Sequence, residues 1–228
     1  MFEGSRYGAM PTTFLIRHGE SESNVGLPTI DPKDVVLTSL GRKQAERIAE
    51  YLKFHPLDLI VTSPYLRTKQ TAEPTAFAFH DTHERAIAEK VWPVQEFTYL
   101  SSMHQTYSTI EERRPRVSEY WEKSDPGFVD SLESESFREF IDRVRAFLER
   151  LGNVEDEYET IAVFSHQQFI NAAIWLIEHD PIEMSSKTMR QFRNYLDDNS
   201  LDNGAIVQMR FSHYENRWRY EWITGHHS

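Results

Sequence analysis

Short apolar runs alternate along the chain with longer segments in which apolar residues recur at every third or fourth position. The short runs are bounded by polar or turn residues and are rich in Ile, Val, Leu and Phe, which is typical of buried strands. They cover residues 12–16, 57–61 and 160–164, with further strands predicted over 90–95, 204–211 and 218–224. The longer period predicts helices beginning at Thr38 or Ser39, over 65–71, over 135–151 and over 170–177. The chain is therefore predicted to alternate strands and helices.

Three of the predicted strands carry features that limit where they can lie. Pro93 interrupts the run over 90–95, and because proline has no N–H to donate, this run is expected at the edge of a sheet or in an irregular form. The last two runs flank Glu215 and Asn216, which favours a hairpin. Strands alternating with helices of this length predict an α/β fold, a three-layer α/β/α arrangement with a mostly parallel central sheet.

The predicted elements fit one domain with an insertion. The chain has 228 residues, which is enough for a sizeable core. Residues 1–11 hold two glycines and a proline without a clear period, and we expect a disordered leader or expression remnant there. Residues 12–228 are predicted to form a single domain. Within it, residues 97–134 are longer than a simple connection needs and are expected to form a helical cap.

Composition narrows the classes of function. A formal net charge of −11 argues against general nucleic-acid binding, because a polyanion would be repelled. The absence of cysteine excludes disulfides, a thiol nucleophile and thiolate metal ligands. The sequence has neither a signal-peptide pattern nor an apolar stretch of membrane-spanning length. We therefore expect a cytoplasmic protein without nucleic-acid or membrane partners, and the sequence leaves a homodimer open.

Four short polar motifs follow the ends of predicted strands: Arg17-His18, Arg67, Glu96 and His166. Parallel strands end at the same edge of a sheet, and open α/β sheets bind ligands at that edge, so these side chains are expected to converge. An imidazole can attack an electrophile when its other ring nitrogen is held by a hydrogen bond, and a guanidinium suits a phosphate-type anion. The pattern indicates phosphoryl transfer through a phosphohistidine.

Three longer motifs surround these residues. They are Leu15 to Ser21 with Asn24, Leu37 to Gly41 with Gln44-Ala45, and Thr62 to Thr68 with Gln70-Thr71-Ala72. Followed by Glu96 and Ser165-His166, they resemble the motifs of the histidine phosphatase superfamily, also called the phosphoglycerate mutase-like family. The resemblance spans roughly residues 12–177, and the motifs are specific as a set although each alone is weak. It implies a phosphoglycerate mutase-like fold and a reaction that needs no cofactor or metal.

The resemblance and the chemistry of the side chains assign the same roles. His18 is expected to be the nucleophile, attacking through Nε2 while the carbonyl of Gly19 holds Nδ1–H, and the missing side chain of Gly19 is expected to permit a tight turn. Arg17 and Arg67 are expected to keep His18 neutral by charge repulsion and to bind the phosphate oxygens. The phosphate is thus expected to lie between these three side chains.

Three further residues complete the predicted site. His166 is expected to be a second imidazole on the phosphate, acting as a cation or donor. Asn24 can donate from its amide to the same oxygens, although Asn is also common in loop turns. Glu96 is expected to protonate the leaving oxygen and then deprotonate the attacking water, which requires a raised pKa. Glu20 is expected to be structural. No metal is needed in this scheme, because fixed cations take its place.

The cap segment mixes aromatic side chains with cations. Arg113 and Arg114 are candidates to bind a carboxylate or second phosphate of the substrate. The alternative is a surface helix in which neighbouring glutamates pair with these arginines. Elsewhere, residues 80–83 (His-Asp-Thr-His) have the composition of a metal site but lack recognised ligand spacing, so a metal is not expected there.

Two departures from the family motifs bear on the activity. Mutases of the family usually follow the second histidine with Gly-Asn and the glutamate with an aromatic and glycine stretch, whereas this chain has Gln167-Gln168 and Phe97-Thr98. This favours a metal-independent phosphomonoesterase of the histidine acid phosphatase type, acting on a small phosphorylated metabolite, over a phosphoglycerate mutase. A non-catalytic module that binds phosphorylated ligands is the third alternative. Gln167 also replaces a glycine common in the phosphatases, which leaves helix amides to approach the phosphate.

Overall fold

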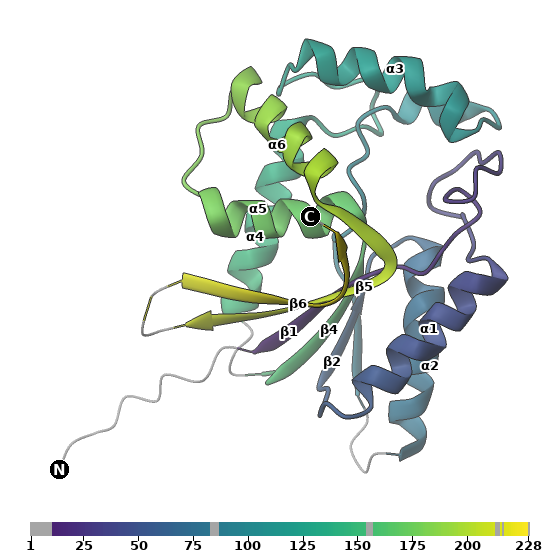
Figure 1. The fold of residues 1–228 in the computed structure, drawn as a ribbon, viewed down its shortest axis with the longest axis vertical. Coiled ribbons are helices and arrows are strands. Elements are labelled where there is room, and N and C mark those ends of the chain that lie inside the picture. The colour runs from purple at the N-terminus through teal and green to yellow at the C-terminus, as the bar shows by residue number, and fades with distance from the viewer. Residues whose placement is uncertain (1–10, 83–86, 154–156, 213–214, 216, 228) are drawn as a thin grey trace.

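The computed structural model describes residues 11–82, 87–153, 157–212, 215 and 217–227 (Figure 1). The elements in chain order are β1 (Thr12–Arg17), α1 (Ser39–Leu52), β2 (Leu59–Thr62), α2 (Leu66–Thr82), β3 (Ala88–Val91), the 3-10 helix η1 (Ser101–Gln105), α3 (Ile110–Lys123), α4 (Phe137–Asn153), β4 (Thr160–Ser165), α5 (Gln167–His179), α6 (Ser186–Asp198), β5 (Ser200–Ser212) and β6 (Arg217–His227). The leader predicted at the N-terminus lies outside the described residues, except for Pro11, which is buried.

The described strands form one sheet in the order β3-β2-β4-β1-β5-β6. Parallel pairing joins β3 to β2, β2 to β4 and β4 to β1, while β5 runs antiparallel to β1 and β6 antiparallel to β5. The prediction of a mostly parallel sheet is confirmed, and β3, the strand nearest Pro93, lies at the edge of the sheet. Arg17 pairs in register with Ser165, so β1 and β4 end side by side. The residues that follow these two strands are therefore neighbours.

Helices cover both faces of the sheet, and α3 lies beyond one end of the sheet, where it packs against α6 (Figure 1). Phe14 and Ile16 of β1 pack in a core cluster with buried residues of α1 and α2, whereas Leu15 packs in a second cluster with residues of α4, α5 and α6. Because successive residues of a strand point to opposite faces, the two clusters lie on opposite faces of the sheet. The predicted three-layer α/β/α fold is confirmed.

Two elements differ from the sequence prediction. Strand β3 covers Ala88–Val91 instead of residues 90–95, because Pro93 has no N–H to continue the ladder and the following residues leave the sheet. Helix α6 was not predicted, because its buried apolar residues, Met189, Phe192 and Leu196, are few within a polar segment. The hairpin of β5 and β6 forms as predicted, although Asn216 of its turn lies outside the described residues.

The predicted cap segment is partly helical. It contains η1 and α3, and α3 begins with a capping box in which Thr109 and Glu112 exchange hydrogen bonds. Tyr120 and Trp121 at the other end of α3 are buried and join the same core cluster as α4 and α6. The C-terminal end of α3 thus packs against the helical layer, and the rest of the cap segment lies near the edge of the sheet.

Candidate active site

The predicted site residues lie where the parallel strands end. Arg17 ends β1 and His18 follows it, Arg67 lies in the first turn of α2 just after β2, and His166 is the N-cap residue of α5 just after β4. Glu96 lies in the irregular segment after β3. All of these except His166 line one cavity of about 340 Å³. His166 is fully buried and contacts Arg67 directly. The structure therefore brings the five residues together.

The hydrogen bonds of His18 define its protonation state. Nδ1 lies 2.7 Å from the carbonyl oxygen of Gly19 and must donate to it, as expected from the sequence. Nε2 accepts a hydrogen bond from Nε of Arg67 at 3.0 Å, because a guanidinium can only donate. His18 is thus a neutral imidazole with its Nε2 lone pair turned toward Arg67. Burial, followed by the charges of Arg67 and Arg17, holds the pKa of His18 well below its usual value of 6.5.

Gly19 is required for a different reason than the predicted tight turn. A Cβ atom at Gly19 would lie 2.5 Å from the carbonyl oxygen of Gly41, so the loop after His18 packs directly against the backbone of α1. Gly19 N also donates to Oγ1 of Thr71 at 3.0 Å. The neighbouring Glu20 accepts a hydrogen bond from Oγ1 of Thr38 at 2.6 Å and lies in a structural position. These contacts fix the backbone that holds Nδ1 of His18.

Arg67 is the centre of the site. Its Nε donates to His18, its NH2 donates to Nδ1 of His166 at 3.0 Å, and its NH1 donates to the carbonyl oxygen of Pro32 at 2.6 Å. Arg67 is only 8% exposed as a residue, and its guanidinium bridges the two imidazoles. Burial lowers the pKa of Arg67 to about 10, with Glu96 opposing the shift, so Arg67 remains a cation at neutral pH.

His166 is held as a neutral imidazole. Since Nδ1 accepts from Arg67, Nε2 carries the proton and donates to Oγ of Ser63 at 2.8 Å. Burial and then the charge of Arg67 hold the pKa of His166 well below 6.5. The neutral ring differs from the cation expected from the sequence but keeps one N–H donor, which is directed at Ser63. The sequence analysis does not predict a role for Ser63. Ser63 directly follows β2, and this position just after a strand is the signal that identifies His18 and His166.

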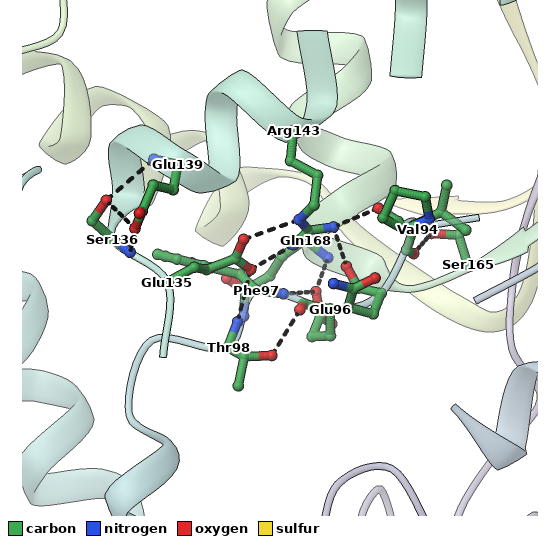
Figure 2. Close-up of polar contacts among 12 residues, drawn as sticks. Val94, Glu96, Phe97, Thr98, Glu135, Ser136, Glu139, Arg143, Ser165 and Gln168 are labelled. Atoms are coloured by element: carbon green, nitrogen blue, oxygen red, sulfur yellow. Dashed lines mark hydrogen bonds and ion pairs between the residues drawn. The ribbon is translucent and has the colours of Figure 1, made fainter. Parts of the chain in front are cut away.

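Glu96 has the surroundings of a proton-transfer group. One carboxyl oxygen, Oε1, accepts hydrogen bonds from the amides of Phe97 at 3.2 Å and Gln168 at 3.0 Å (Figure 2). Burial raises the pKa of Glu96 above 4.5, while the charges of Arg67 and Arg17 and the two amides oppose the shift. The backbone N–H of Gln168, in the first turn of α5, thus binds this carboxyl group.

Arg17 and Asn24 complete the polar lining of the cavity. One NH group of Arg17 donates to the carbonyl oxygen of Leu201, and its buried Nε has no partner in the described structure. The side-chain oxygen of Asn24 accepts from the backbone and the hydroxyl of Ser21 at 3.0 and 2.8 Å, and from Asn203 at 3.1 Å. Because the oxygen of Asn24 is engaged, its amide nitrogen is the end that can donate to a ligand.

The two candidate arginines of the cap occupy different environments. Arg113 is 9% exposed, lines the cavity, and donates from NH1 to the carbonyl oxygen of Ser108 at 2.6 Å. Arg114 is exposed and pairs with Glu111 at 2.7 Å, as the surface-helix alternative expected. The structure thus brings Arg113, but not Arg114, to the cavity. The apolar part of the wall comes mostly from the cap segment: Phe97, Tyr99, Leu100, Met103, Ile110 and Val117.

Within the described ranges, no three His, Asp or Glu side chains come together as a metal-ligand group. His80 of the His-Asp-Thr-His run instead lies 2.9 Å from the carboxylate of Glu89, and His83 falls outside the described residues. Among the helices that the structure describes, none is long and apolar enough to cross a membrane.

The fold and this arrangement agree with the comparison of the sequence with known families. The sequence matches the histidine phosphatase superfamily (branch 1) over residues 13–220. The chain therefore belongs to the histidine phosphatase superfamily.

Similar proteins include several phosphatases. The uncharacterized phosphatase PhoE of Bacillus subtilis is 32% identical over 118 residues, which cover 47% of this chain and 61% of that protein. The matched stretch thus spans about three fifths of that relative. The adenosylcobalamin/alpha-ribazole phosphatase of Escherichia coli is 26% identical over 185 residues, covering 79% of this chain and 83% of that protein. A phosphoserine phosphatase of Entamoeba histolytica, solved with phosphoserine, has a TM-score of 0.68 at 21% identity, covers 94% of this chain and 98% of its own, and shows the shared fold.

Proposed function

We propose that the chain is a metal-independent phosphomonoester hydrolase of the histidine acid phosphatase type, acting through a phosphohistidine on a small phosphorylated metabolite. One observation carries the proposal: neutral His18 presents Nε2 to the Arg67 guanidinium at the cavity that Glu96 also lines. A nucleophile, a phosphate-binding cation and a proton donor thus meet in one small volume. Membership of the superfamily and the names of similar phosphatases support it.

In the first step, Nε2 of His18 attacks phosphorus, so that an N–P bond forms while the bond to the leaving oxygen breaks. The guanidinium of Arg67 turns from the imidazoles to the phosphate oxygens, with Arg17 beside it, and their charges stabilise the transition state. Protonated Glu96 gives its proton to the leaving oxygen, which departs as an alcohol. The raised pKa of Glu96 suits this step, because the carboxyl group must hold a proton before the attack.

In the second step, water attacks the phosphorus of the phosphohistidine and the N–P bond breaks. The Glu96 carboxylate left by the first step takes a proton from this water. Inorganic phosphate leaves, and both His18 and Glu96 return to their starting protonation states. The same carboxyl group therefore serves as acid and then as base, and the hydrogen bond from Nδ1 of His18 to the carbonyl oxygen of Gly19 keeps His18 in the same tautomer throughout.

The leaving group would occupy the part of the cavity lined by the cap. That part is mostly apolar, with Arg113 as its cation. Its composition suits a leaving group with an apolar portion and one anionic group that reaches Arg113. We therefore include Arg113 in the substrate-binding residues and leave out Arg114, which pairs with Glu111 at the surface.

A turnover screen tests the proposed hydrolysis. The protein is assayed for release of inorganic phosphate from sugar phosphates, nucleotides, phosphoserine and phosphoglycerates, with and without a metal chelator. We expect release that the chelator does not change and that falls by at least about 1,000-fold in His18→Ala, as when other catalytic nucleophiles are removed. The exposed His179→Ala serves as the matched histidine control and should retain wild-type turnover.

The same screen separates the two alternatives. A phosphoglycerate mutase would exchange phosphate between 2- and 3-phosphoglycerate faster than it releases inorganic phosphate. A binding module would bind phosphate esters without turning any of them over. Either result would overturn the proposed hydrolysis.

A further inference from the structure

The segment that carries Glu96 has no regular secondary structure, yet it is tightly held. Residues 93–98, called here the Glu96 segment, leave the sheet after β3, so their backbone groups have no strand to pair with. Arg143 of α4 donates from NH1 to the carbonyl oxygens of Pro93 at 2.9 Å and Gln95 at 3.0 Å. Figure 2 shows Arg143 reaching from its helix toward this segment. The guanidinium therefore supplies donors on the N-terminal side of Glu96.

Glu135 holds the other side of the Glu96 segment. Its backbone N–H donates to the carbonyl oxygen of Thr98 at 2.9 Å, and its carboxylate accepts from the amide of Thr98 at 3.2 Å. The same carboxylate accepts from Nε of Arg143 at 2.9 Å and also from NH2. Arg143 and Glu135 thus form one bidentate ion pair that is hydrogen-bonded to the segment both before and after Glu96.

The pair is itself held in place. Arg143 and Glu135 have side-chain exposures of only 13% and 18%. The guanidinium lies over the rings of Phe140 and Phe169, 5.2 and 5.4 Å from their centres, which restricts its rotamers. A second anchor comes from β4, where Oγ of Ser165 donates to the carbonyl oxygen of Val94 at 2.6 Å.

The pair acts on Glu96 through geometry more than through charge. The charges that oppose the raised pKa of Glu96 are those of Arg67 and Arg17. Arg143 contacts no atom of the Glu96 carboxyl group in the described structure, and its own charge is paired with Glu135. What the pair controls is therefore the position of the backbone from which Glu96 extends.

We propose that Arg143, braced by Glu135, is a positioning residue for proton transfer by Glu96. The inference rests on the proposed function, in which Glu96 protonates the leaving oxygen. A proton donor must come within hydrogen-bonding distance of the atom that it protonates, and a misplacement of 1 Å can cost a large factor in rate. Without Arg143, the carbonyl oxygens of Pro93 and Gln95 lose the donor that they share, so the backbone before Glu96 is no longer tied to α4.

The test compares substrates that need the acid to different extents. Arg143→Met keeps the length and apolar stem but removes every donor. We measure kcat/KM, which reports on the phosphorylation step, for a series of aryl and alkyl phosphomonoesters of increasing leaving-group pKa. An alkyl leaving group needs protonation, so kcat/KM for alkyl phosphates should fall by about 100-fold. A p-nitrophenyl leaving group does not, so its kcat/KM should change by less than about threefold.

Two further variants complete the design. Arg145→Met, in the same helix, removes an arginine that pairs with Asp142 and Asp180 and should leave the whole series unchanged. Arg143→Lys keeps the positive charge but loses the planar guanidinium with its several N–H donors. Its kcat/KM should depend on the leaving group in the same way, with a smaller loss. This variant also provides the test if Arg143→Met fails to fold. In Glu96→Gln, kcat/KM should show the strongest dependence on the leaving group, with the largest loss for alkyl phosphates. Adding Arg143→Met to Glu96→Gln should cost no further activity toward alkyl phosphates.

Equal losses for aryl and alkyl substrates, in Arg143→Met or in Arg143→Lys, would overturn the positioning role, as would full additivity with Glu96→Gln. Failure of the proposed function looks different: wild-type protein would release no phosphate from any substrate, or His18→Ala would remain active. The two ideas therefore fail by separate results.

Discussion

Nε of Arg67 donates a hydrogen bond to Nε2 of His18 at 3.0 Å, so the cation proposed to bind phosphate lies on the lone pair that is proposed to attack phosphorus. The arrangement keeps the imidazole neutral, because a protonated Nε2 could not accept this bond and would face a buried charge. A bound phosphate gives the guanidinium better acceptors than an imidazole nitrogen. Under the proposed function, substrate binding and release of the nucleophile are coupled through this one side chain.

Removing this side chain should change the titration of His18. In Arg67→Met, one of the two positive charges that lower the pKa of His18 is lost, so the pKa should rise toward 6.5. NMR titration of the imidazole nitrogens measures the change. Lys69→Met, on the exposed side of the same helix, should leave the titration unchanged. A pKa of His18 that stays at its wild-type value in Arg67→Met would contradict this explanation of its neutral state.

The pH dependence of kcat/KM should have an acidic optimum. Neutral His18 becomes more abundant as pH rises through its pKa, which lies well below 6.5, whereas protonated Glu96 becomes less abundant as pH rises through its pKa, which lies above 4.5. With an alkyl phosphate, activity should therefore persist below pH 6.5 and decline on the alkaline side. Glu96→Gln should lose the alkaline decline measured with the same substrate. An unchanged profile in Glu96→Gln would rule out Glu96 as the acid.

Arg113 should affect the recognition of charged leaving groups. In Arg113→Met, KM for a substrate with a carboxylate on its leaving group should rise by about 10- to 100-fold, the usual worth of one hydrogen bond between charged groups. A substrate with an uncharged leaving group should keep its KM. Arg114→Met is the matched control, because Arg114 lies outside the cavity lining. The same rise for both substrates, or for Arg114→Met, would show that Arg113 does not select for charge.

Gly41 should be sensitive to the smallest substitution. A Cβ atom at this position would lie 2.0 Å from the carbonyl oxygen of Glu20, so Gly41→Ala must push apart α1 and the loop after His18. We expect a loss of about 1–3 kcal/mol in the free energy of unfolding, measured in urea, and a lower kcat. Gly127→Ala, whose Cβ would lie 3.6 Å from Oδ1 of Asp125, should be close to neutral. Equal stability of the two variants would contradict the tight packing at Gly41.

Much of the site could be predicted because its residues directly follow strands. His18, Arg67 and His166 each lie within five residues of a strand that the apolar pattern makes visible, and parallel strands bring such positions together. Arg143 escaped prediction because its partners, Pro93 and Gln95, lie 50 and 48 residues away, and it occurs within the regular pattern of an amphipathic helix. Contacts across such distances depend on packing that a local pattern does not contain.

In the fold, too, elements with a clear local pattern could be predicted and elements that depend on distant packing could not. The buried strands and the amphipathic helix α4 were predicted from their apolar residues, and the fold class is confirmed. Helix α6 was missed because only a narrow face of it is apolar, and that face becomes recognisable through its packing against Trp121 and Trp175. That residues 12–228 form a single domain stays a prediction.

The central claim is that His18 carries the phosphoryl group during turnover, and rapid chemical quench tests it most directly. A phosphomonoester carrying radioactive phosphorus is mixed with the enzyme, the reaction is stopped in alkali within milliseconds, and peptide mass spectrometry locates the label. We predict base-stable, acid-labile phosphate on His18 that forms and decays fast enough to account for turnover. Release of inorganic phosphate at the wild-type rate without label on His18 would contradict the account.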